Sequence, residues 1–379
     1  SVFEGYFQGY KTMKPTALAH TTGKFNRVTA TIIFLELVRN LELKYRVAGI
    51  GIGLFVGELT ALLILVYLFL LHHKNSIHSQ KSNHQNRSSY REIIKELARF
   101  SLPITSGRLI NSIIQSTKAV LIPFQLTKSG LPETKAAAVY GQLSGMAQQI
   151  IFLPSIITSS LTKSLIPALS EAYSRQNFRK IEKNYQDLIR IITYLGFPLT
   201  VIFNLYGPEI CQLVYSHPEA GKILSHLSFS VTFIYYLQVS SGMLHGLGKP
   251  KLALRNLALG NLTQLIGIFL LVKFPALRIQ GAVIAITGGS IGAALLNYLN
   301  LGQIIDFPKN ISLLFYKPLL GSSIIYFINF IFRQYIYRQT GTIISGFNLI
   351  IILSVNLIIY IIFMFLCGAI TRTDLKKIH

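Results

Sequence analysis

Residues 140–172, YGQLSGMAQQIIFLPSIITSSLTKSLIPALSEA, decide the fold class of this chain. Lys163 and Glu171 are the only charged side chains in this stretch, and a bilayer core about 30 Å thick needs about 20 mainly apolar residues in a helix. The whole chain has the same character, since 51% of its 379 residues are hydrophobic and 13% are charged, against about a quarter charged in soluble proteins. The sequence therefore predicts a polytopic α-helical membrane protein.

Further segments share this apolar character when Gly, Pro and charge clusters are taken as helix boundaries. The predicted helices cover residues 18–42, 46–71, 97–122, 136–162, 186–206, 224–245, 252–272, 280–303, 311–332 and 342–368. Charged and polar residues dilute the first segment, which rests mainly on the run TATIIFLELV. With loops included, we expect about ten membrane spans.

The basic residues predict the orientation in the membrane. The formal charge of +22 arises from 36 Lys and Arg against 14 Asp and Glu, and most of the basic residues lie in short connections between apolar segments. This placement follows the positive-inside rule and lacks the aromatic interleaving of a nucleic-acid groove, so no nucleic-acid partner is expected. The 72–96 and 170–185 connections, the GKPK turn near 248 and the tail TRTDLKKIH are predicted to be cytoplasmic, which places both chain ends inside.

No pattern in the sequence matches a catalytic centre, a metal site or a cofactor site. The histidines of the polar 72–96 stretch lack metal-ligand spacing, so this stretch is interpreted as a solvated linker. Cys211 and Cys367 are too isolated for a disulfide framework or a CxxC site. The glycine runs at 49–53 and 288–292 predict close helix packing rather than nucleotide binding, because no strand precedes them. We expect no enzyme activity, no metal and no cofactor.

Two parts of the sequence resemble each other. GYFQG at 5–9, followed by KP at 14–15, matches GMLHG at 242–246, followed by KP at 249–250. RVAG at 46–49 and RIQG at 278–281 recur at a similar offset, and each begins a Gly-rich apolar helix. We infer two copies of one helical unit. In the second copy, four predicted spans precede or carry the GMLHG element. In the first copy, the matching GYFQG element already begins at residue 5. We therefore expect the first copy to lack roughly 145 residues and most of four helices.

A family resemblance rests on four segments: GYFQGYKTMKPTA, ELARFSLPITSGRLINSIIQSTKAVLIP, the stretch VYGQLSGMAQQIIFLPSIITSSLTKSLIPALSEAYS, and SGMLHGLGKPKLALRN. They extend over most of the chain, which resembles the multidrug/oligosaccharidyl-lipid/polysaccharide (MOP) flippase superfamily, and within it the polysaccharide biosynthesis proteins of the stage V sporulation protein B group. The resemblance implies two six-helix lobes and a final helix pair around a central cavity. It also implies transport of lipid-linked sugars or cell-wall precursors.

The expected fold is therefore all-α and MATE/MOP flippase-like, with two pseudo-symmetric lobes of which the first is truncated. Residues 1–71 are assigned to the remnant of the first lobe with two spans, and 72–96 to a cytoplasmic linker. Residues 97–303 are assigned to the second six-helix lobe, and 304–379 to the final two helices with a cytoplasmic tail. The expected location is a bacterial cytoplasmic membrane, among membrane lipids; the sequence predicts no oligomeric state.

Polar residues line one broad face of the predicted helix 97–122. They recur at steps of three or four, as expected for one helical face: Ser101, Thr105, Arg108, Asn111, Gln115 and Lys118. A charge at the bilayer centre costs about 2.5–3.5 kcal/mol even on lenient insertion scales. Arg108 and Lys118 are therefore predicted to face a cavity or a polar partner rather than lipid.

The predicted helix 136–162 has a similar polar face, formed by Ser144, Gln148, Ser155, Ser159 and Thr162, with Lys163 near its cytoplasmic end. By the resemblance, these two helices are the seventh and eighth of the fold and help to line the central cavity. The predicted substrate-binding residues are Arg108, Asn111, Gln115, Lys118, Gln148, Ser155, Ser159 and Lys163. No catalytic or metal-binding residue is predicted.

Basic residues outnumber acids within the predicted spans. Glu36 and Glu58 are the clear intramembrane acids, whereas the basic residues are Lys24, Arg27, Arg108, Lys118, Lys163 and Lys317. This balance favours an anionic cargo, whose phosphates a planar arginine can hold bidentately while lysines act as point charges. Two alternatives stay open. The lysines near helix ends, at 24, 163 and 317, can simply extend their ammonium groups to the membrane–water interface. Glu58 can be a structural partner of a basic residue or a protonatable coupling site.

The expected function is alternating-access transport of an undecaprenyl-diphosphate-linked sugar or peptidoglycan precursor, in cell-wall or polysaccharide biosynthesis or in sporulation. The expected partner is thus a lipid-linked anionic saccharide. A first alternative is a cation-coupled multidrug exporter of the same fold, which would carry an acidic residue in its cavity. A second is a non-transporting membrane scaffold for envelope assembly, which has no need of Arg108 in a bilayer.

Overall fold

The computed structural model describes the chain except for residues 1, 10–13, 78–89, 306–311, 341–345 and 369–379. The described residues are largely helical and contain no strand. They form two compact units, residues 1–90 and 91–379, and each is described by itself. Residues 78–89 of the predicted 72–96 linker and the predicted cytoplasmic tail lie outside the described residues, whereas 72–77 and 90–96 are helical. The chain is an all-α, polytopic membrane protein.

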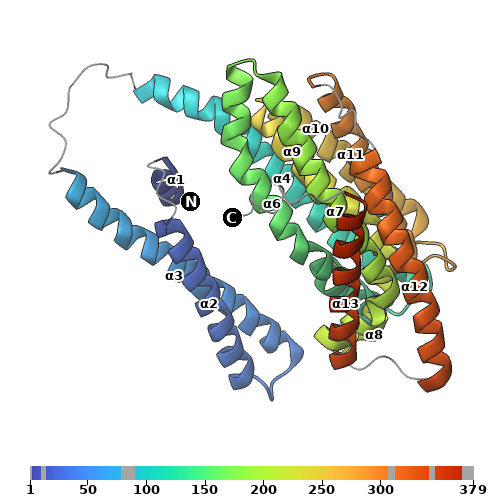
Figure 1. The fold of residues 1–379 in the computed structure, drawn as a ribbon. Coiled ribbons are helices and arrows are strands. Elements are labelled where there is room, and N and C mark those ends of the chain that lie inside the picture. Colours follow the sequence, from blue (N-terminus) through green and yellow to red (C-terminus); the bar gives the residue numbers. More distant parts are fainter. Residues whose placement is uncertain (1, 10–13, 78–89, 306–311, 341–345, 369–379) are drawn as a thin grey trace. The chain divides into compact units, whose positions relative to one another are not determined.

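The first unit contains three helices, α1 (Val2–Gly9), α2 (Lys14–Leu37) and α3 (Leu43–Ile77). A short connection joins α2 to α3, and the two helices lie side by side (Figure 1). Each helix contributes one buried apolar residue to a small core: Phe7, Ala19 and Leu65. The helical hairpin of α2 and α3 is therefore the main element of this unit.

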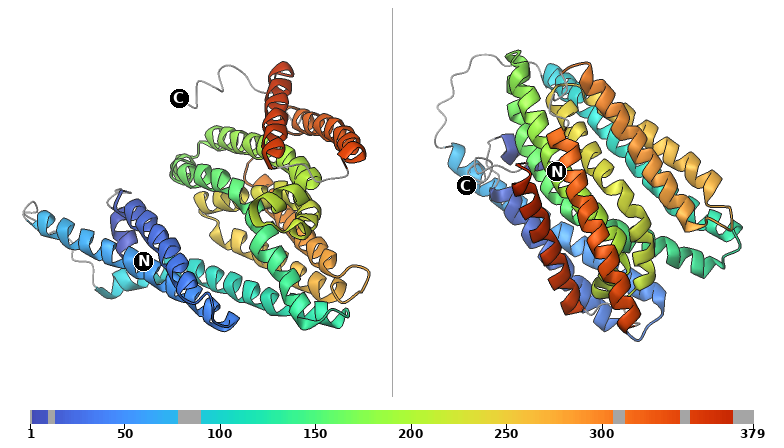
Figure 2. Two further views of the ribbon diagram at one scale, coloured as in Figure 1. Left: turned by 90° about the horizontal axis from the view of Figure 1, so that it is seen from below. Right: turned by 45° about the vertical axis from the view of Figure 1, so that its right-hand side comes forward.

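The second unit contains the remaining helices. They are α4 (Tyr90–Lys128), α5 (Glu133–Gly141), the π-helix η1 (Gln142–Ala147), α6 (Gln148–Ser174), α7 (Phe178–Tyr215), α8 (Pro218–Leu227), the 3₁₀ turn η2 (Ser228–Ser230), α9 (Val231–Gly246), α10 (Pro250–Leu271), α11 (Ile279–Gly302), the π-helix η3 (Ser312–Tyr316), α12 (Lys317–Thr340) and α13 (Gly346–Leu366). Its long helices run roughly along one direction (Figures 1 and 2). Their shared core includes Leu126, Leu169 and Tyr235, all fully buried.

All ten segments predicted as spans are largely helical where the structure describes them. Seven helical segments of the described chain are long and apolar enough to cross a membrane, among them 44–72, 133–174 and 279–302. The predicted spans at α2, α4 and α9 fall outside this set. Polar residues dilute α2, as its sequence indicates, and α9 has only 16 residues because the turn η2 interrupts the predicted 224–245 helix.

The internal repeat has a counterpart in the packing of two helix pairs. A Cβ atom added to Gly23 of α2 would lie 2.8 Å from the Cβ of Ala61 and 2.9 Å from the carbonyl oxygen of Gly57, both in α3. A Cβ atom added to Gly260 of α10 would lie 2.6 Å from the Cβ of Ala293 and 2.7 Å from the carbonyl oxygen of Gly289, both in α11.

These two crossings use the same positions of the repeat. Gly260 follows Gly23 at the same separation along the chain at which GMLHG follows GYFQG, and Gly289 follows Gly57 at the separation at which RIQG follows RVAG. Glycine permits such close approach of two helix backbones in a membrane. Within the glycine runs predicted to pack helices, Gly53 and Gly289 lie close to Thr31 and Gln264 of the neighbouring helices, whereas Gly51, Gly288 and Gly292 have open space beside them.

Helix α7 is longer than the predicted 186–206 segment, and it includes Glu209. Gly207 and Pro208 were expected to end the helix, but Tyr206 adopts a non-helical conformation (φ −112°, ψ 17°) and the helix continues beyond the kink to Tyr215. Glu209 therefore lies inside a continuous helix, near its end, and not in a connection between helices. The assignment of Glu36 and Glu58 as the clear intramembrane acids stays a prediction.

Glu209 is paired with a cation that the sequence analysis also placed outside a span. α12 extends through Thr340, so Arg333 lies within the helix, and its Nη2 is 3.0 Å from Oε1 of Glu209. Its Nη1 also donates a hydrogen bond to the carbonyl oxygen of Leu205, next to the kink. Arg333 thus holds the residues on both sides of the α7 kink to α12.

Candidate functional site

The second unit encloses a cavity of about 580 Å³. Residues of α4, α6, α9, α10 and α11 form most of its wall. The polar residues of the wall are Asn111, Gln115, Lys118, Gln148, Ser155, Ser159, Thr162, Lys163, Gln238, Ser241, His245, Asn261, Gln264 and Ser290. Because these side chains lie in apolar helices, they form a polar chamber within the membrane-spanning part of the unit.

Seven of the eight predicted substrate-binding residues line this one cavity: Asn111, Gln115, Lys118, Gln148, Ser155, Ser159 and Lys163. The eighth, Arg108, has a side chain outside the part of the chain that the structure describes. Helical spacing on α4 and α6 thus brings the predicted polar faces together. Their role in binding a substrate stays a prediction.

Lys118 is the most buried cation of the cavity wall, with 7% of its surface exposed. Its Nζ donates a hydrogen bond of 3.2 Å to Oδ1 of Asn261 and a second one to Oε1 of Gln264. The amide of Asn261 in turn donates to Asn111, and that of Gln264 donates to Ser290. All of these partners are neutral, so none of them compensates the positive charge.

An ammonium group has three N–H donors, and the described residues accept from two of them. Burying a charge without an opposite charge is costly, since hydrogen bonds from neutral groups replace only part of the lost hydration. Lys118 therefore has both a spare donor and an uncompensated charge at the wall of a cavity. This arrangement is suited to an anionic ligand.

Sequence reasoning missed the amides that hold Lys118. Asn261 and Gln264 of α10 are three residues apart and so share one helical face, but only the polar faces of the predicted helices 97–122 and 136–162 were assigned to the cavity. A signal was present nonetheless, because an amide buried in a membrane helix requires a polar partner. Gln238 of α9 was missed for the same reason; its Oε1 accepts a hydrogen bond of 2.8 Å from Thr158.

The hydroxyl groups on α6 present mainly acceptor sites. Ser155 donates to the carbonyl oxygen of Phe152, and Ser159 donates to that of Ile156. Each hydroxyl proton is thus used within the helix, while the oxygen lone pairs are left for a ligand. The side-chain amides of Gln115 and Gln148 offer both donors and acceptors. Such a mixed lining can bind the hydroxyl groups of a saccharide.

The charge of the cavity wall is positive. Lys163 and His245 line it together with Lys118, and none of the described wall residues is acidic. The Glu209–Arg333 pair, by contrast, is not among the wall residues. The cavity therefore favours anions over cations.

A narrower groove of about 350 Å³ adjoins the cavity between α4 and α10. Leu257 and Asn261 belong to the walls of both spaces, so the groove and the cavity are neighbours. Apolar residues form most of its remaining wall, and Lys251 and Arg255 stand near the beginning of α10. The groove combines an apolar surface with two cations.

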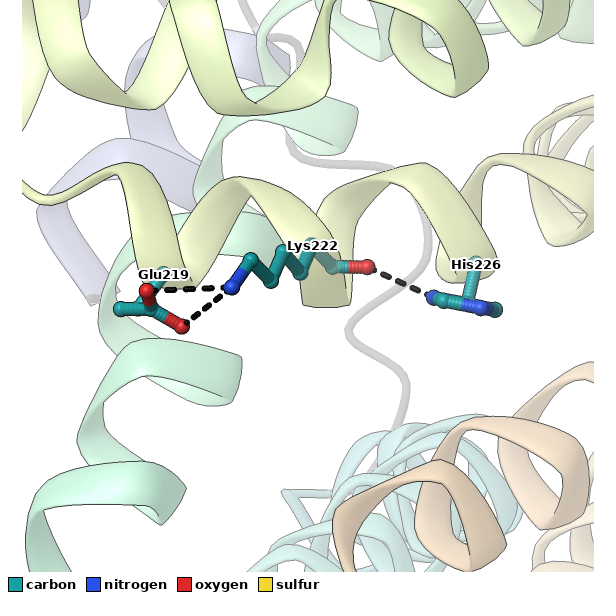
Figure 3. A network of polar contacts seen from close by, with 3 residues as sticks. All are labelled: Glu219, Lys222 and His226. Atoms are coloured by element: carbon teal, nitrogen blue, oxygen red, sulfur yellow. Dashed lines mark hydrogen bonds and ion pairs between the residues drawn. The ribbon is translucent and has the colours of Figure 1, made fainter.

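A separate charged cluster on α8 has the opposite character, because it neutralises itself. Nζ of Lys222 lies 3.1 Å from both carboxylate oxygens of Glu219, and Nδ1 of His226 donates to the carbonyl oxygen of Lys222 at 2.7 Å (Figure 3). These three residues line a pocket of about 230 Å³. With its cation already paired, this pocket is a weaker anion site than the cavity.

Comparison with known proteins shows which families this chain is similar to. A family model described as "Polysaccharide biosynthesis protein" matches residues 1–173, and a second one, "MatE", matches residues 129–270. "Stage V sporulation protein B" of Bacillus subtilis (strain 168) is 26% identical over 379 residues, covering all of this chain and 72% of the relative. These matches make the chain similar to polysaccharide biosynthesis and MatE proteins, and the solved structures that it resembles include transporters of the MOP superfamily.

Solved structures of this superfamily share the fold. "Lipid II flippase MurJ, inward closed conformation" matches with a TM-score of 0.61 and 16% identity, covering 94% of this chain and 67% of that one. An inward-facing multidrug resistance MATE family transporter of the superfamily matches with a TM-score of 0.61 and 18% identity, covering 80% and 66%. The chain thus spans about two thirds of the length of the MOP proteins it matches.

Proposed function

We propose that this protein translocates a lipid-linked anionic saccharide, with an undecaprenyl-diphosphate carrier, across a bacterial cytoplasmic membrane by alternating access. The observation that carries the proposal is the buried, uncompensated Lys118 at the wall of a polar cavity without a described acidic residue. The name of the MurJ relative, a lipid II flippase, supports the same substrate class.

The diphosphate is assigned to Lys118. A phosphate oxygen accepts the third N–H of this ammonium group, and its negative charge compensates the buried cation. Lys163, and Arg108 on the predicted cavity face of α4, add further positive charge around the headgroup. The hydroxyl and amide groups of α6 and α9 then bind the saccharide, because they offer donors and acceptors without charge.

The lipid tail is assigned to the groove between α4 and α10. Its apolar wall suits an isoprenoid chain, and its position next to the cavity, with Leu257 and Asn261 in both walls, puts the tail beside the head. Lys251 and Arg255 attract the diphosphate as it enters from the cytoplasmic surface, where the positive-inside rule puts the GKPK turn. Both ends of the chain are assigned to this side.

Transport needs no covalent step. Rocking of one helical lobe against the other exposes the cavity to alternate sides, and the protein binds the headgroup in both states. We therefore propose that the chain is not an enzyme. A scaffold without transport has no use for a polar cavity with an uncompensated cation. A multidrug exporter with cationic cargo needs an acidic residue in its cavity, whereas this cavity wall has Lys118.

Reconstituted vesicles test this function. An undecaprenyl-diphosphate-linked sugar with a fluorescent label is placed in the membrane, and the fraction of headgroups exposed to an impermeant quencher is followed over time. We expect faster exchange between leaflets with the wild-type protein than in protein-free vesicles, and loss of most of this increase with Arg108→Ala or Lys118→Met. A cationic dye in parallel vesicles should not be transported.

Two results would contradict the proposal. Transport of the cationic dye without exchange of the labelled lipid would favour the multidrug exporter. Lipid exchange equal to that of protein-free vesicles, from a folded preparation of the whole protein, would favour the scaffold. Unchanged exchange with Arg108→Ala alone would remove that residue from the mechanism and leave Lys118 as the assigned phosphate ligand.

A further inference from the structure

The two glycine crossings put residues of the first unit in register with the residues that hold Lys118. Gly23 corresponds to Gly260, so the next residue, Lys24, corresponds to Asn261. One helical turn later, and with the register unchanged, Arg27 corresponds to Gln264.

The partner helices are aligned by the other glycine of each crossing. Gly57 of α3 corresponds to Gly289 of α11, so the next residue, Glu58, corresponds to Ser290. The first unit thus has two cations and one carboxylate where the second unit has two amides and one hydroxyl group.

The structure of the second unit shows that these positions lie within reach of one another. Nε2 of Gln264 donates to Oγ of Ser290 across the α10–α11 crossing, at 3.5 Å. In the first unit, a Cβ atom added to Gly57 would lie 2.5 Å from the Cβ of Arg27. Arg27 therefore extends from α2 beside the residue that precedes Glu58. The same helix crossing that forms a polar site in one unit positions a charged site in the other.

Arg27 and Glu58 lie at the level of the middle of an apolar helix. Glu58 stands at the middle of the membrane segment 44–72, and the crossing with Gly57 brings Arg27 to the same level. Charged side chains are rare at this depth, and they bind a ligand, bind an ion or pair with each other. Lys24, Arg27 and Glu58 are exposed on the first unit, and neither cation forms an ion pair with a carboxylate of the described residues.

We propose that Lys24 and Arg27 form a second diphosphate-binding site, the repeat-related counterpart of the Lys118 site, and that Glu58 is a nearby carboxylate that opposes binding of the ligand. The ligand is a group with several phosphate charges, because two cations against one carboxylate leave a net positive charge that neither a sugar nor a cationic drug compensates. The negative charge of Glu58 repels the phosphates. The inference rests on the proposed function, since it names a second site, on the first unit, for the same class of ligand.

Equilibrium binding of inorganic diphosphate to the purified whole protein in nanodiscs tests this site. Lys118→Met is used as the background, because it removes the ammonium group of the cavity site. We expect saturable binding to persist in this background and to weaken about tenfold or more on adding Arg27→Gln, since hydrogen bonds to charged groups are lost. Adding Glu58→Gln instead should strengthen binding severalfold, because this repulsion is gone.

Several controls separate a binding defect from a folding defect. Arg27→Lys keeps the charge and should restore at least half of the lost binding free energy, whereas Lys44→Gln, at the exposed beginning of α3, should leave the affinity within about twofold. A gain of affinity with Glu58→Gln cannot arise from misfolding. Vesicle-forming phosphatidylglycerol, a monoanionic lipid, should not displace the diphosphate from the Lys118→Met protein.

Three outcomes would overturn the second site. Binding that disappears with Lys118→Met alone, in a folded protein, refutes it and leaves the proposed function intact. Residual binding that Arg27→Gln and Glu58→Gln do not change, or that phosphatidylglycerol abolishes, refutes it as well. Absence of any diphosphate binding to the wild-type protein would overturn the second site together with the proposed function.

Discussion

The Glu209–Arg333 pair should respond unequally to the removal of its two partners. Glu209 is 5% exposed and has one carboxylate oxygen, Oε2, with no hydrogen-bond partner, whereas the side chain of Arg333 is 37% exposed and also donates to the carbonyl oxygen of Leu205. Arg333→Met therefore leaves a buried carboxylate without a counter-ion. Glu209→Gln leaves a cation that keeps one hydrogen bond and can contact water.

The expected costs follow from these differences. Removing the partner of a buried charge costs about 3–5 kcal/mol, so we expect this loss of unfolding free energy for Arg333→Met. Loss of one charge-assisted hydrogen bond costs about 1.5–3 kcal/mol, and the partial exposure of Arg333 puts Glu209→Gln at or below the lower end of that range. The double variant should be more stable than Arg333→Met alone, because the orphaned carboxylate is gone.

Unfolding in detergent micelles, followed by far-ultraviolet circular dichroism, measures these differences for the two single variants and the double variant. Arg179→Met, at an exposed position near the beginning of the same helix α7, is the control and should change stability by no more than about 0.5 kcal/mol. Equal costs for the two single variants would refute the reasoning. A Glu209→Gln protein less stable than the Arg333→Met protein would refute it as well.

Three further predictions concern the cavity, its groove and the repeat crossing. Lys118→Met should weaken the binding of undecaprenyl diphosphate about tenfold or more in a filtration assay, while Lys128→Met in the last turn of α4 should not. Gly107→Phe should weaken undecaprenyl diphosphate binding more than inorganic diphosphate binding, because a Cβ atom there would lie 2.1 Å from Leu254 in the groove; equal effects would exclude the groove as the tail site. Gly260→Leu should destabilise the protein by about 1–3 kcal/mol in thermal unfolding, since α10 and α11 must separate, whereas Gly288→Leu in open space should have little effect.

Local spacing predicted the parts of the site that lie on one helix. Asn111, Gln115 and Lys118 follow one another at helical intervals, so the sequence is enough to put them on one face, and the structure brings them to the cavity wall with Gln148 and Ser155 of α6. The apolar character of the segments predicted the helices themselves for the same reason. Both signals depend on residues that are close together along the chain.

Contacts between distant residues were not predictable in this way. Lys118 and its acceptor Asn261 are 143 positions apart, so no local spacing along the chain connects them. The Glu209–Arg333 pair was missed because Gly207 and Pro208 are typical of a helix end, although the kink at Tyr206 lets α7 continue. The repeat was visible as a sequence match, but the residues that correspond across it became clear only from the glycine crossings.

The position of the diphosphate tests the central claim most directly. An experimental structure of the whole protein with bound undecaprenyl diphosphate, determined by electron cryomicroscopy, would show it. We expect a phosphate oxygen about 2.7–2.9 Å from Nζ of Lys118, inside the cavity formed by α4, α6, α9, α10 and α11. A diphosphate bound outside this cavity, with Lys118 still contacting only Asn261 and Gln264, would contradict the account.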